Sequence, residues 1–290
     1  MTSALGRRFR GASAGYLLIA PAVIATVVFL LIPMIVSGYL SLTHYNGIKP
    51  PEFVGLQNYA EVLANPRFQR AFQNTVFFVV MGMAIGPLLG LGTAILLNDN
   101  LRLRALFRTS FFLPTMTSLI VVATIWKLMY ADNGIINAIA AFFGLPGHAW
   151  LTDPTTALPA VVITAIWQGF GFETVVFLAA LQAIPRELYD AARVDGAGGR
   201  AQFRYVTLPG LRPTILFIYI IGIIGSFQVF DQIFVMTQGR PGVSTRTVVY
   251  DMLDEFNRLN LGTASAIAYM LLLILAILSF LQMRFFEERD

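Results

Sequence analysis

The chain has 290 residues, of which 57% are apolar and only 12% charged, and its formal net charge is +4. Soluble domains carry about 25% charged residues, so this chain lacks the polar surface to cover a soluble core and is expected to cross a membrane several times. It has no cysteine, which excludes a disulfide scaffold and thiolate metal sites.

Six apolar runs are long enough to cross a bilayer, because a helical span needs roughly 20 apolar residues. The sequence predicts an all-α membrane protein with six transmembrane helices, over approximately residues 15–40, 75–97, 109–129, 157–181, 215–236 and 264–283. Pro21 and Pro33 lie in the first run, which is therefore expected to be tilted, kinked or partly interfacial. That run is too long for a cleaved signal peptide.

The basic residues predict the orientation of these spans. Thirteen of the 20 Lys and Arg residues fall on the side of both termini, six fall on the other side, and Lys127 lies at the end of a span. The positive-inside rule then places both termini in the cytoplasm. The expected organisation is a cytoplasmic N-terminus (1–14), a six-span domain (15–283) with a cytoplasmic loop (182–210), and a cytoplasmic tail (284–290). No basic and aromatic stripe suits a nucleic acid.

Catalytic and cofactor chemistry is sparse. The two histidines, His44 and His148, are far apart and are expected to be solvated loop residues rather than metal ligands. Neither Lys49 nor Lys127 follows a glycine, so the chain has no Walker A phosphate loop. We expect no enzyme activity and no cofactor in this chain, and any ATP must be used by another chain.

The loop after the fourth span predicts two short helices joined by glycine. Pro185 suits the first turn of a helix, and Gly196 suits its left-handed C-terminal cap. A second helix carrying Phe203 and Val206 is expected to end at Pro209. The alternative is an ordinary amphipathic connector that lies on the lipid headgroups.

The spacing Asp190-Ala191-Ala192-x3-Gly196-x9-Val206-x-Leu208-Pro209 resembles the Glu-Ala-Ala loop of binding-protein-dependent ABC importer permeases. Aspartate replaces the usual glutamate, and valine the usual isoleucine. The resemblance implies a type I ABC importer permease fold, in which this loop is the coupling helix that docks on a cytoplasmic ATPase. The residues implied in coupling are Glu187, Asp190, Ala191, Ala192, Asp195, Gly196 and Ala197.

Further segments are similar to the carbohydrate-uptake branch of that family. They are the run from Phe53 to Tyr59, Asn74-Thr75, and the region from Phe230 to Pro241, where Arg240 stands in place of a glycine. The chain resembles the larger maltose permease subunit, without its extra spans and its external insertion.

The same resemblance implies sugar-facing residues in the fourth span: Ala165, Gln168, Gly169 and Phe172. Their spacing of i, i+3, i+4 and i+7 independently places them on one helix face. The alternative is a packing seam of small residues around a buried glutamine. The implied lining continues in the third and fifth spans with Thr115, Gly222, Ser226 and Val229, and Gln228 and Gln232 are alternative hydrogen-bond donors.

Glu173 and Asp231 are intramembrane carboxylates, which are functional candidates because lone charges are costly in lipid. A structural role facing the bundle is an equal alternative for both.

Taken together, the resemblance implies a permease subunit of an ATP-driven sugar importer in the bacterial cytoplasmic (inner) membrane. Its implied partners are a second homologous permease subunit, two ATP-binding subunits that hold ATP and Mg²⁺, an external sugar-binding protein and the lipid bilayer, with no nucleic acid. The alternatives are an ABC permease for another solute class and a secondary transporter, although paired intramembrane carboxylates and internal repeats are not evident.

Overall fold

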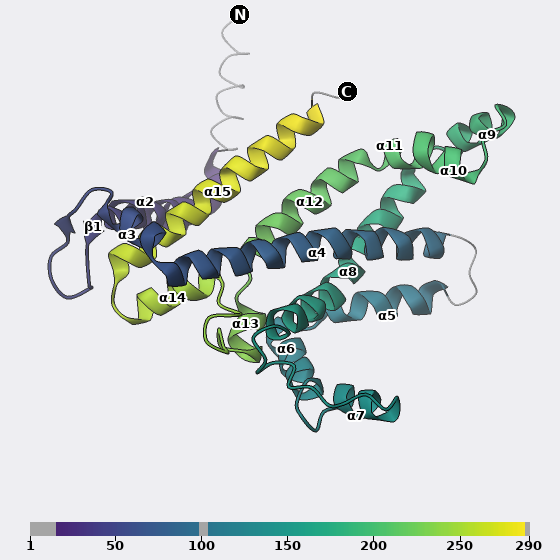
Figure 1. Ribbon diagram of the computed structural model, residues 1–290. Coiled ribbons are helices and arrows are strands. Elements are labelled where there is room, and N and C mark those ends of the chain that lie inside the picture. Colours follow the sequence, from purple (N-terminus) through teal and green to yellow (C-terminus); the bar gives the residue numbers. More distant parts are fainter. Residues whose placement is uncertain (1–15, 99–103, 288–290) are drawn as a thin grey trace, which may run out of the picture. The chain divides into compact units, whose positions relative to one another are not determined.

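The computed structural model of the chain describes residues 16–98 and 104–287 (Figure 1). These residues form two compact units, one built from residues 16–62 and 254–269 and the other from residues 63–253 and 270–287. The N-terminal segment 1–14 lies outside the described residues, and so do Arg102 and Arg289, which the predicted orientation also uses.

The first unit begins with a long apolar helix, Tyr16–Ser41. It contains a π-helical turn, η1 (Val27–Leu31), followed by α2 (Ile32–Ser41). Pro33 has no N–H to donate to the carbonyl group of Phe29 one turn earlier, which accounts for an irregular turn at this point. None of the residues in the helix's most apolar stretch is buried within the described structure. Lipid or another subunit must therefore cover this helix.

A short hairpin and Asn58 organise the rest of the first unit. Strand β1 (Thr43–His44) pairs antiparallel with β2 (Glu52–Phe53), and α3 (Gln57–Ala64) follows. The Asn58 side chain donates hydrogen bonds to the carbonyl oxygens of Ser41 and Thr43, at 2.8 and 2.9 Å. A β-carbon at Gly262 would overlap the same Thr43 carbonyl group. The run from Phe53 to Tyr59 therefore has a structural role, which is to fix the end of the first helix.

The second unit contains the remaining helices. In chain order they are α4 (Pro66–Asn98), α5 (Arg104–Met116), α6 (Leu119–Met129), α7 (Ile135–Phe142), α8 (Ala157–Ala183), α9 (Arg186–Val194), α10 (Gly199–Gln202), the π-helical turn η2 (Phe203–Thr207), α11 (Leu208–Gly210), α12 (Arg212–Phe227), α13 (Asp231–Met236) and α14 (Val248–Asn257). The last helix is α15 (Leu261–Glu287), and both α14 and α15 contribute residues to both units.

In the described residues, five helices are long and apolar enough to cross a membrane, and α5 and α6 together make a sixth. These two helices meet at an angle of 99°. The six-span prediction holds when this bent pair is counted as one span, but the expectation of a continuous third helix is wrong. The break follows Pro114, whose carbonyl oxygen accepts the N–H of Thr117 at 3.2 Å in a tight turn, and Ser118 is extended.

Helix α8 lies at the centre of the second unit. Its first half packs in a cluster with Phe78, Ala123 and Ile233, and its last part packs in another with Ala94 and Ile218. Gly171 lets α5 approach α8 closely. A β-carbon at this position would overlap the carbonyl group of Phe111 on α5. The predicted role of the intramembrane glycines in close helix contact thus holds at this position.

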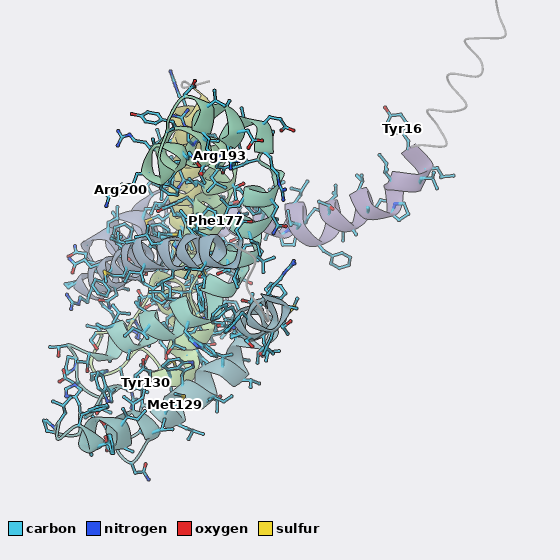
Figure 2. All side chains as sticks on the ribbon, turned by 90° about the vertical axis from the view of Figure 1, so that its right-hand side faces the viewer. Tyr16, Met129, Tyr130, Phe177, Arg193 and Arg200 are labelled. Carbon is cyan, nitrogen blue, oxygen red and sulfur yellow. The ribbon has the colours of Figure 1, made fainter. Side chains whose placement is uncertain are left out.

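The loop after α8 lies at one end of the second unit, and the end of α6 lies at the other. Figure 2 shows Arg193 and Arg200 at one end and Tyr130 at the other, with the buried Phe177 between them. Arg193 and Arg200 belong to the loop after α8, whose short helices extend beyond the end of α8 (Figure 1).

That loop folds largely as its sequence predicts. Gly196 adopts the left-handed conformation, with φ of 78°, and the N–H of Ala197 reaches back to the carbonyl oxygen of Ala192 at 2.8 Å. The second helix, predicted to end at Pro209, ends one residue later, where α11 ends at Gly210. Pro209 follows the π-helical turn η2, as Pro33 follows η1, and at both places proline has no N–H to donate to the preceding turn.

The Asp251 cluster, which comprises Asp251, Arg246 and Arg67, ties the start of α4 to the segment before α14. Asp251 is 3% exposed, and its Oδ1 lies 2.6 Å from Nε of Arg246 and 3.4 Å from Nε of Arg67. Beside it, the Asn74 side chain donates to the carbonyl oxygens of Val243 and Arg246, at 2.8 and 2.9 Å. The Asn74 motif therefore has a structural role.

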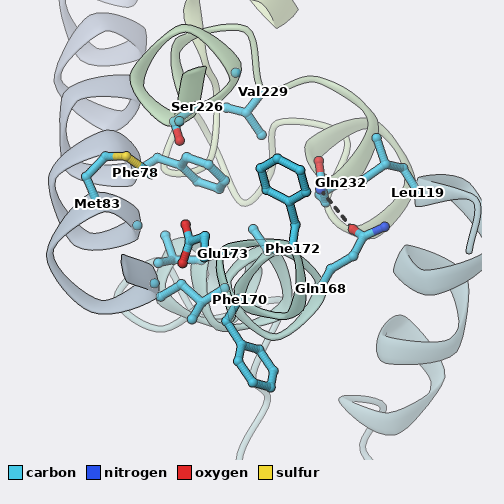
Figure 3. A pocket seen from close by; sticks show the side chains of 18 of the residues that line it. Phe78, Met83, Leu119, Gln168, Phe170, Phe172, Glu173, Ser226, Val229 and Gln232 are labelled. Carbon is cyan, nitrogen blue, oxygen red and sulfur yellow. Dashed lines mark hydrogen bonds between the residues drawn. The ribbon is translucent and has the colours of Figure 1, made fainter. Parts of the chain in front are cut away.

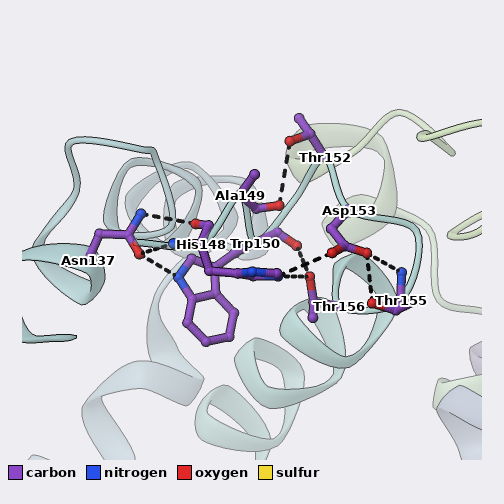
Figure 4. Close-up of polar contacts among 8 residues, drawn as sticks. All are labelled: Asn137, His148, Ala149, Trp150, Thr152, Asp153, Thr155 and Thr156. Atoms are coloured by element: carbon purple, nitrogen blue, oxygen red, sulfur yellow. Dashed lines mark hydrogen bonds and ion pairs between the residues drawn. The ribbon is translucent and has the colours of Figure 1, made fainter. Parts of the chain in front are cut away.

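The connection between α7 and α8 is held by polar contacts (Figure 4). The side-chain amide of Asn137 exchanges two 3.0 Å hydrogen bonds with the backbone of His148, and the indole N–H of Trp150 donates to the same amide at 2.9 Å. His148 also lies 3.0 Å from the Thr156 hydroxyl group and 3.5 Å from Asp153. His148 is thus a structural part of this loop rather than a freely solvated side chain.

Candidate transport cavity

A cavity of about 650 Å³ lies in the second unit between the two clusters that flank α8 (Figure 3). Its size falls within the range of about 300–1,000 Å³ that is typical of small-molecule sites. Its wall is formed by one face of α8 together with parts of α4 and α12 and two irregular segments. These segments are the break between α5 and α6 and the break between α12 and α13.

Both helix breaks lie at this cavity. Thr117 and Leu119 line it from the first break, and Gln228, Val229 and Phe230 line it from the second. Non-helical backbone is tolerated at membrane depth only where protein buries it or where it borders a cavity. Broken helices of this kind supply polar backbone groups at the binding sites of many transporters.

Gln168 on α8 connects the two breaks. Its side-chain amide donates to the carbonyl oxygen of Thr117 at 3.3 Å and accepts from the amide of Gln232 at 3.5 Å. The Thr115 hydroxyl group donates to the backbone carbonyl oxygen of Gln168 at 2.9 Å. Removing the Gln168 amide would leave the Thr117 carbonyl group without this donor, so its role is partly structural.

Aromatic and small residues complete the wall. The side chain of Phe172 projects from α8 into the cavity and is 37% exposed (Figure 3). Gly169, Gly222 and Gly225 lie around it and leave backbone atoms accessible. The cavity therefore offers one apolar ring face beside amides, hydroxyl groups and peptide groups.

Two carboxylates and no basic side chain line this cavity. Glu173 is 9% exposed, and its Oε2 atom is buried without a hydrogen-bond partner. Asp231, in the first turn of α13, is partly buried. All 25 lining residues belong to the described part of the chain, and none of them is Lys, Arg or His.

All ten residues that the sequence predicts to face the substrate line this cavity. They are Thr115, Ala165, Gln168, Gly169, Phe172, Gly222, Ser226, Gln228, Val229 and Gln232. The structure shows that these residues line one cavity, whereas their contact with a substrate remains a prediction.

The prediction missed the wall that α4 contributes. Phe78, Gly82, Met83 and Gly86 also line the cavity, and their spacing places them on one face of this helix. Helical periodicity could have identified that face, but nothing local distinguishes it from an apolar packing surface.

The predicted coupling residues lie on α9 and in the turn that follows it. Most of these residues are exposed to solvent, namely Glu187, Asp190, Ala191, Asp195 and Gly196. Only Ala192 and Ala197 are half-buried. The apolar residues Leu188 and Val194 are 51% and 88% exposed. Asp190 pairs with Arg193 one turn later. Tyr189 instead faces its own chain, where its hydroxyl group lies 2.9 Å from that of Thr207.

Residues 16–98 and 104–287 contain no candidate metal-binding site. No group of three or more His, Asp or Glu side chains in these segments is arranged to hold an ion.

Comparisons with known proteins agree with this architecture. Residues 86–289 match the family described as binding-protein-dependent transport system inner membrane component. The lactose transport system permease protein LacF of Rhizobium radiobacter is 35% identical over 283 residues, which cover 95% of this chain and 94% of that protein. The trehalose/maltose transport system permease protein MalF of Thermococcus litoralis is 36% identical over 276 residues, which cover 94% and 92%.

A similar fold occurs in a crystal structure of a bacterial alginate ABC transporter in complex with an alginate pentasaccharide-bound periplasmic protein. The TM-score is 0.85 at 22% identity, with 95% of this chain and 94% of that chain covered. Since the family match spans well over half of the sequence, the chain belongs to the family of binding-protein-dependent transport system inner membrane components.

Proposed function

We propose that this chain is the transmembrane permease subunit of an ATP-driven sugar importer, and that the sugar crosses the membrane through the cavity beside α8. The observation that carries this proposal is the cavity itself, where two broken helices, a pair of glutamines and an accessible phenylalanine ring border one space. The relatives named for lactose and for trehalose/maltose transport support a sugar as the solute.

The chemistry of the wall suits a carbohydrate. Amide side chains both donate and accept hydrogen bonds, as sugar hydroxyl groups do. An accessible ring such as that of Phe172 complements the apolar C–H face of a pyranose. Ser226 and the backbone exposed at Gly169 and Gly222 add further polar groups of either kind.

Coupling to ATP hydrolysis is assigned to the loop that contains α9. Leu188 and Val194 are exposed on the same short helix, and this apolar surface is suited to a partner that covers it. Asp190 sits on the same exposed helix, where a basic side chain of an ATP-binding subunit can compete with Arg193. Closure of two ATP-binding subunits, which hold ATP and Mg²⁺, would draw two such loops together and rock the attached spans.

The remaining partners are those that the resemblance to ABC importer permeases implies. A second, homologous permease subunit supplies the other half of the pathway, and lipid covers the remaining apolar helices, including Tyr16–Ser41. An external sugar-binding protein delivers the substrate. The excess of basic residues supports a location of both termini and the α9 loop on the cytoplasmic side of the inner membrane.

A reconstituted complex tests this function. Proteoliposomes that contain this chain, its partner permease and the ATP-binding subunits should take up a sugar only when ATP and the binding protein are both supplied. Uptake driven by an ion gradient without ATP would instead identify a secondary transporter. Uptake of an amino acid but no sugar would identify an ABC permease for another solute class.

The coupling loop is tested separately by the variant Gly196→Pro. The left-handed conformation at Gly196 is inaccessible to proline, so the loop should deform and the ATP-binding subunits should no longer co-purify. The matched control is Gly144→Pro, since Gly144 also has a positive φ, of 74°, with open space around it, but lies in the α7–α8 connection. Normal co-purification in the Gly196 variant would refute the coupling assignment.

A further inference from the structure

Glu173 occupies an unusual position in the wall of the cavity. Figure 3 shows its carboxylate pointing from α8 toward the space between Met83, Phe172 and Ser226. On the opposite helix, α4, Gly86 and Gly90 leave space for the Glu173 side chain. A β-carbon at Gly86 would lie 3.1 Å from Oε2 and 3.2 Å from Oε1 of Glu173, and one at Gly90 would lie 2.6 Å from its β-carbon.

One oxygen atom of this carboxylate has no hydrogen-bond partner among the residues that the structure describes. Its Oε2 atom is buried without a partner, although buried acceptors are nearly always hydrogen-bonded. No basic side chain lines the same cavity. A purely structural carboxylate would be expected to have a basic or hydrogen-bonding partner, because an unpaired buried charge is strongly unfavourable. The unfilled acceptor therefore points to a ligand that supplies the donor.

The sign of the charge restricts that ligand. Glu173 and Asp231 both line the space, so an anionic solute would meet like charge from two sides. At a separation of about 5 Å and an effective dielectric constant of about 20, one such repulsion corresponds to roughly a hundredfold lower affinity. Uncharged sugars escape this repulsion and offer several hydroxyl donors.

We propose that Glu173 is a specificity-determining residue whose carboxylate accepts hydrogen bonds from hydroxyl groups of uncharged sugars and excludes sugars that carry a carboxylate. This inference rests on the proposed sugar-import function and deepens it by naming the substrate class. Gly86 and Gly90 are positioning residues, because they leave the space in which the carboxylate lies.

The test compares wild-type and variant complexes in proteoliposomes with the binding protein and ATP. The probes are lactose, maltose and trehalose, and for each an analogue in which one C6 hydroxymethyl group is oxidised to a carboxylate. Binding of the same probes to the purified complex, measured without the binding protein by saturation-transfer NMR, removes the selectivity of that protein from the result.

The variant Glu173→Gln keeps the shape of the side chain and removes its charge. We expect the KM for the neutral sugar to rise roughly tenfold, because a neutral hydrogen bond replaces a charge-assisted one. The preference for the neutral sugar over its acid analogue should fall by up to a hundredfold. The variant Gly86→Ala, which displaces the carboxylate without removing it, should raise the KM in the same direction.

A purely structural role predicts a different result. Removing a buried unpaired charge would then leave the KM and the selectivity unchanged and would raise the thermal stability. The matched control is Glu61→Gln, the same chemical change on α3, where Glu61 is exposed and accepts from Gln57. Carbodiimide labelling followed by mass spectrometry adds a readout that is independent of transport, since lactose or another transported probe should protect Glu173 from modification.

The two proposals fail in distinguishable ways. A wild-type complex that neither binds nor takes up any of the three disaccharides contradicts the sugar-import function. A wild-type complex that imports a neutral sugar, while Glu173→Gln keeps its KM, its exclusion of the acid analogue and its protection pattern, overturns only the role of Glu173.

Discussion

The variant Asp251→Ala should destabilise the protein strongly, because it removes the carboxylate from a buried ion cluster. Arg246 has a side chain that is only 9% exposed, so its guanidinium group cannot regain full hydration when Asp251 is lost. Arg67 is 27% exposed and can partly turn to water. The unfavourable term therefore comes mainly from Arg246.

The magnitude follows from this difference in burial. Removing one partner of a buried ion pair costs about 3–5 kcal/mol, whereas a solvated pair such as that with Arg67 adds up to about 1 kcal/mol. The stacking of the Arg246 guanidinium over the Tyr250 ring, at 5.1 Å, remains and offsets a small part of the loss. We expect a net loss of about 3–4 kcal/mol.

Thermal unfolding of the purified complex in detergent measures this loss. For a chain of this size the melting temperature should fall by roughly 10 °C, at about 2–4 °C per kcal/mol. The double variant Asp251→Ala/Arg246→Ala should recover part of the loss, because the positive charge that Asp251 balances is then absent as well. A single-variant shift of less than 2 °C, taken as roughly the effect of 1 kcal/mol, or a double variant that is less stable than the single one, would refute the reasoning.

Three further predictions concern transport and packing. Gln168→Ala and Phe172→Ala should each lower the rate of sugar uptake about tenfold or more, because one removes the amide that joins the two helix breaks and the other the accessible ring. Asp190→Lys should abolish uptake and stimulated ATP hydrolysis while the protein still reaches the membrane. Gly171→Ala should destabilise the protein by about 1–3 kcal/mol, because the added methyl group overlaps the backbone of α5.

Matched variants control for the cavity changes and for the packing change. Gln73→Ala alters an exposed glutamine on α4 outside the cavity, and uptake should stay at the wild-type rate. Gly92→Ala adds a methyl group where no atom lies within 4 Å, so its melting temperature should not fall. Wild-type uptake and selectivity in both cavity variants would contradict the cavity assignment, and full ATPase stimulation with Asp190→Lys would contradict the coupling role.

Local sequence signals were enough to locate the spans, the glycine turn after α9 and the side of α8 that lines the cavity. Each depends on nearest neighbours along the chain: apolar length, a residue that tolerates positive φ, and a helical repeat of side chains. Ala165, Gln168, Gly169 and Phe172 share a face in any straight helix, whatever surrounds it.

The tertiary structure alone decided three further features. The third span breaks by 99° after Pro114, and Gln168, about fifty residues away, supplies a donor to the freed Thr117 carbonyl group. The wall from α4 faces the cavity rather than lipid because α8 packs against its glycines. Among the residues that the structure describes, Oε2 of Glu173 has no hydrogen-bond partner, and Gly86 and Gly90, which carry no side chain, lie opposite it. These outcomes depend on which distant groups meet, and that is settled by packing between helices rather than by the residues within one of them.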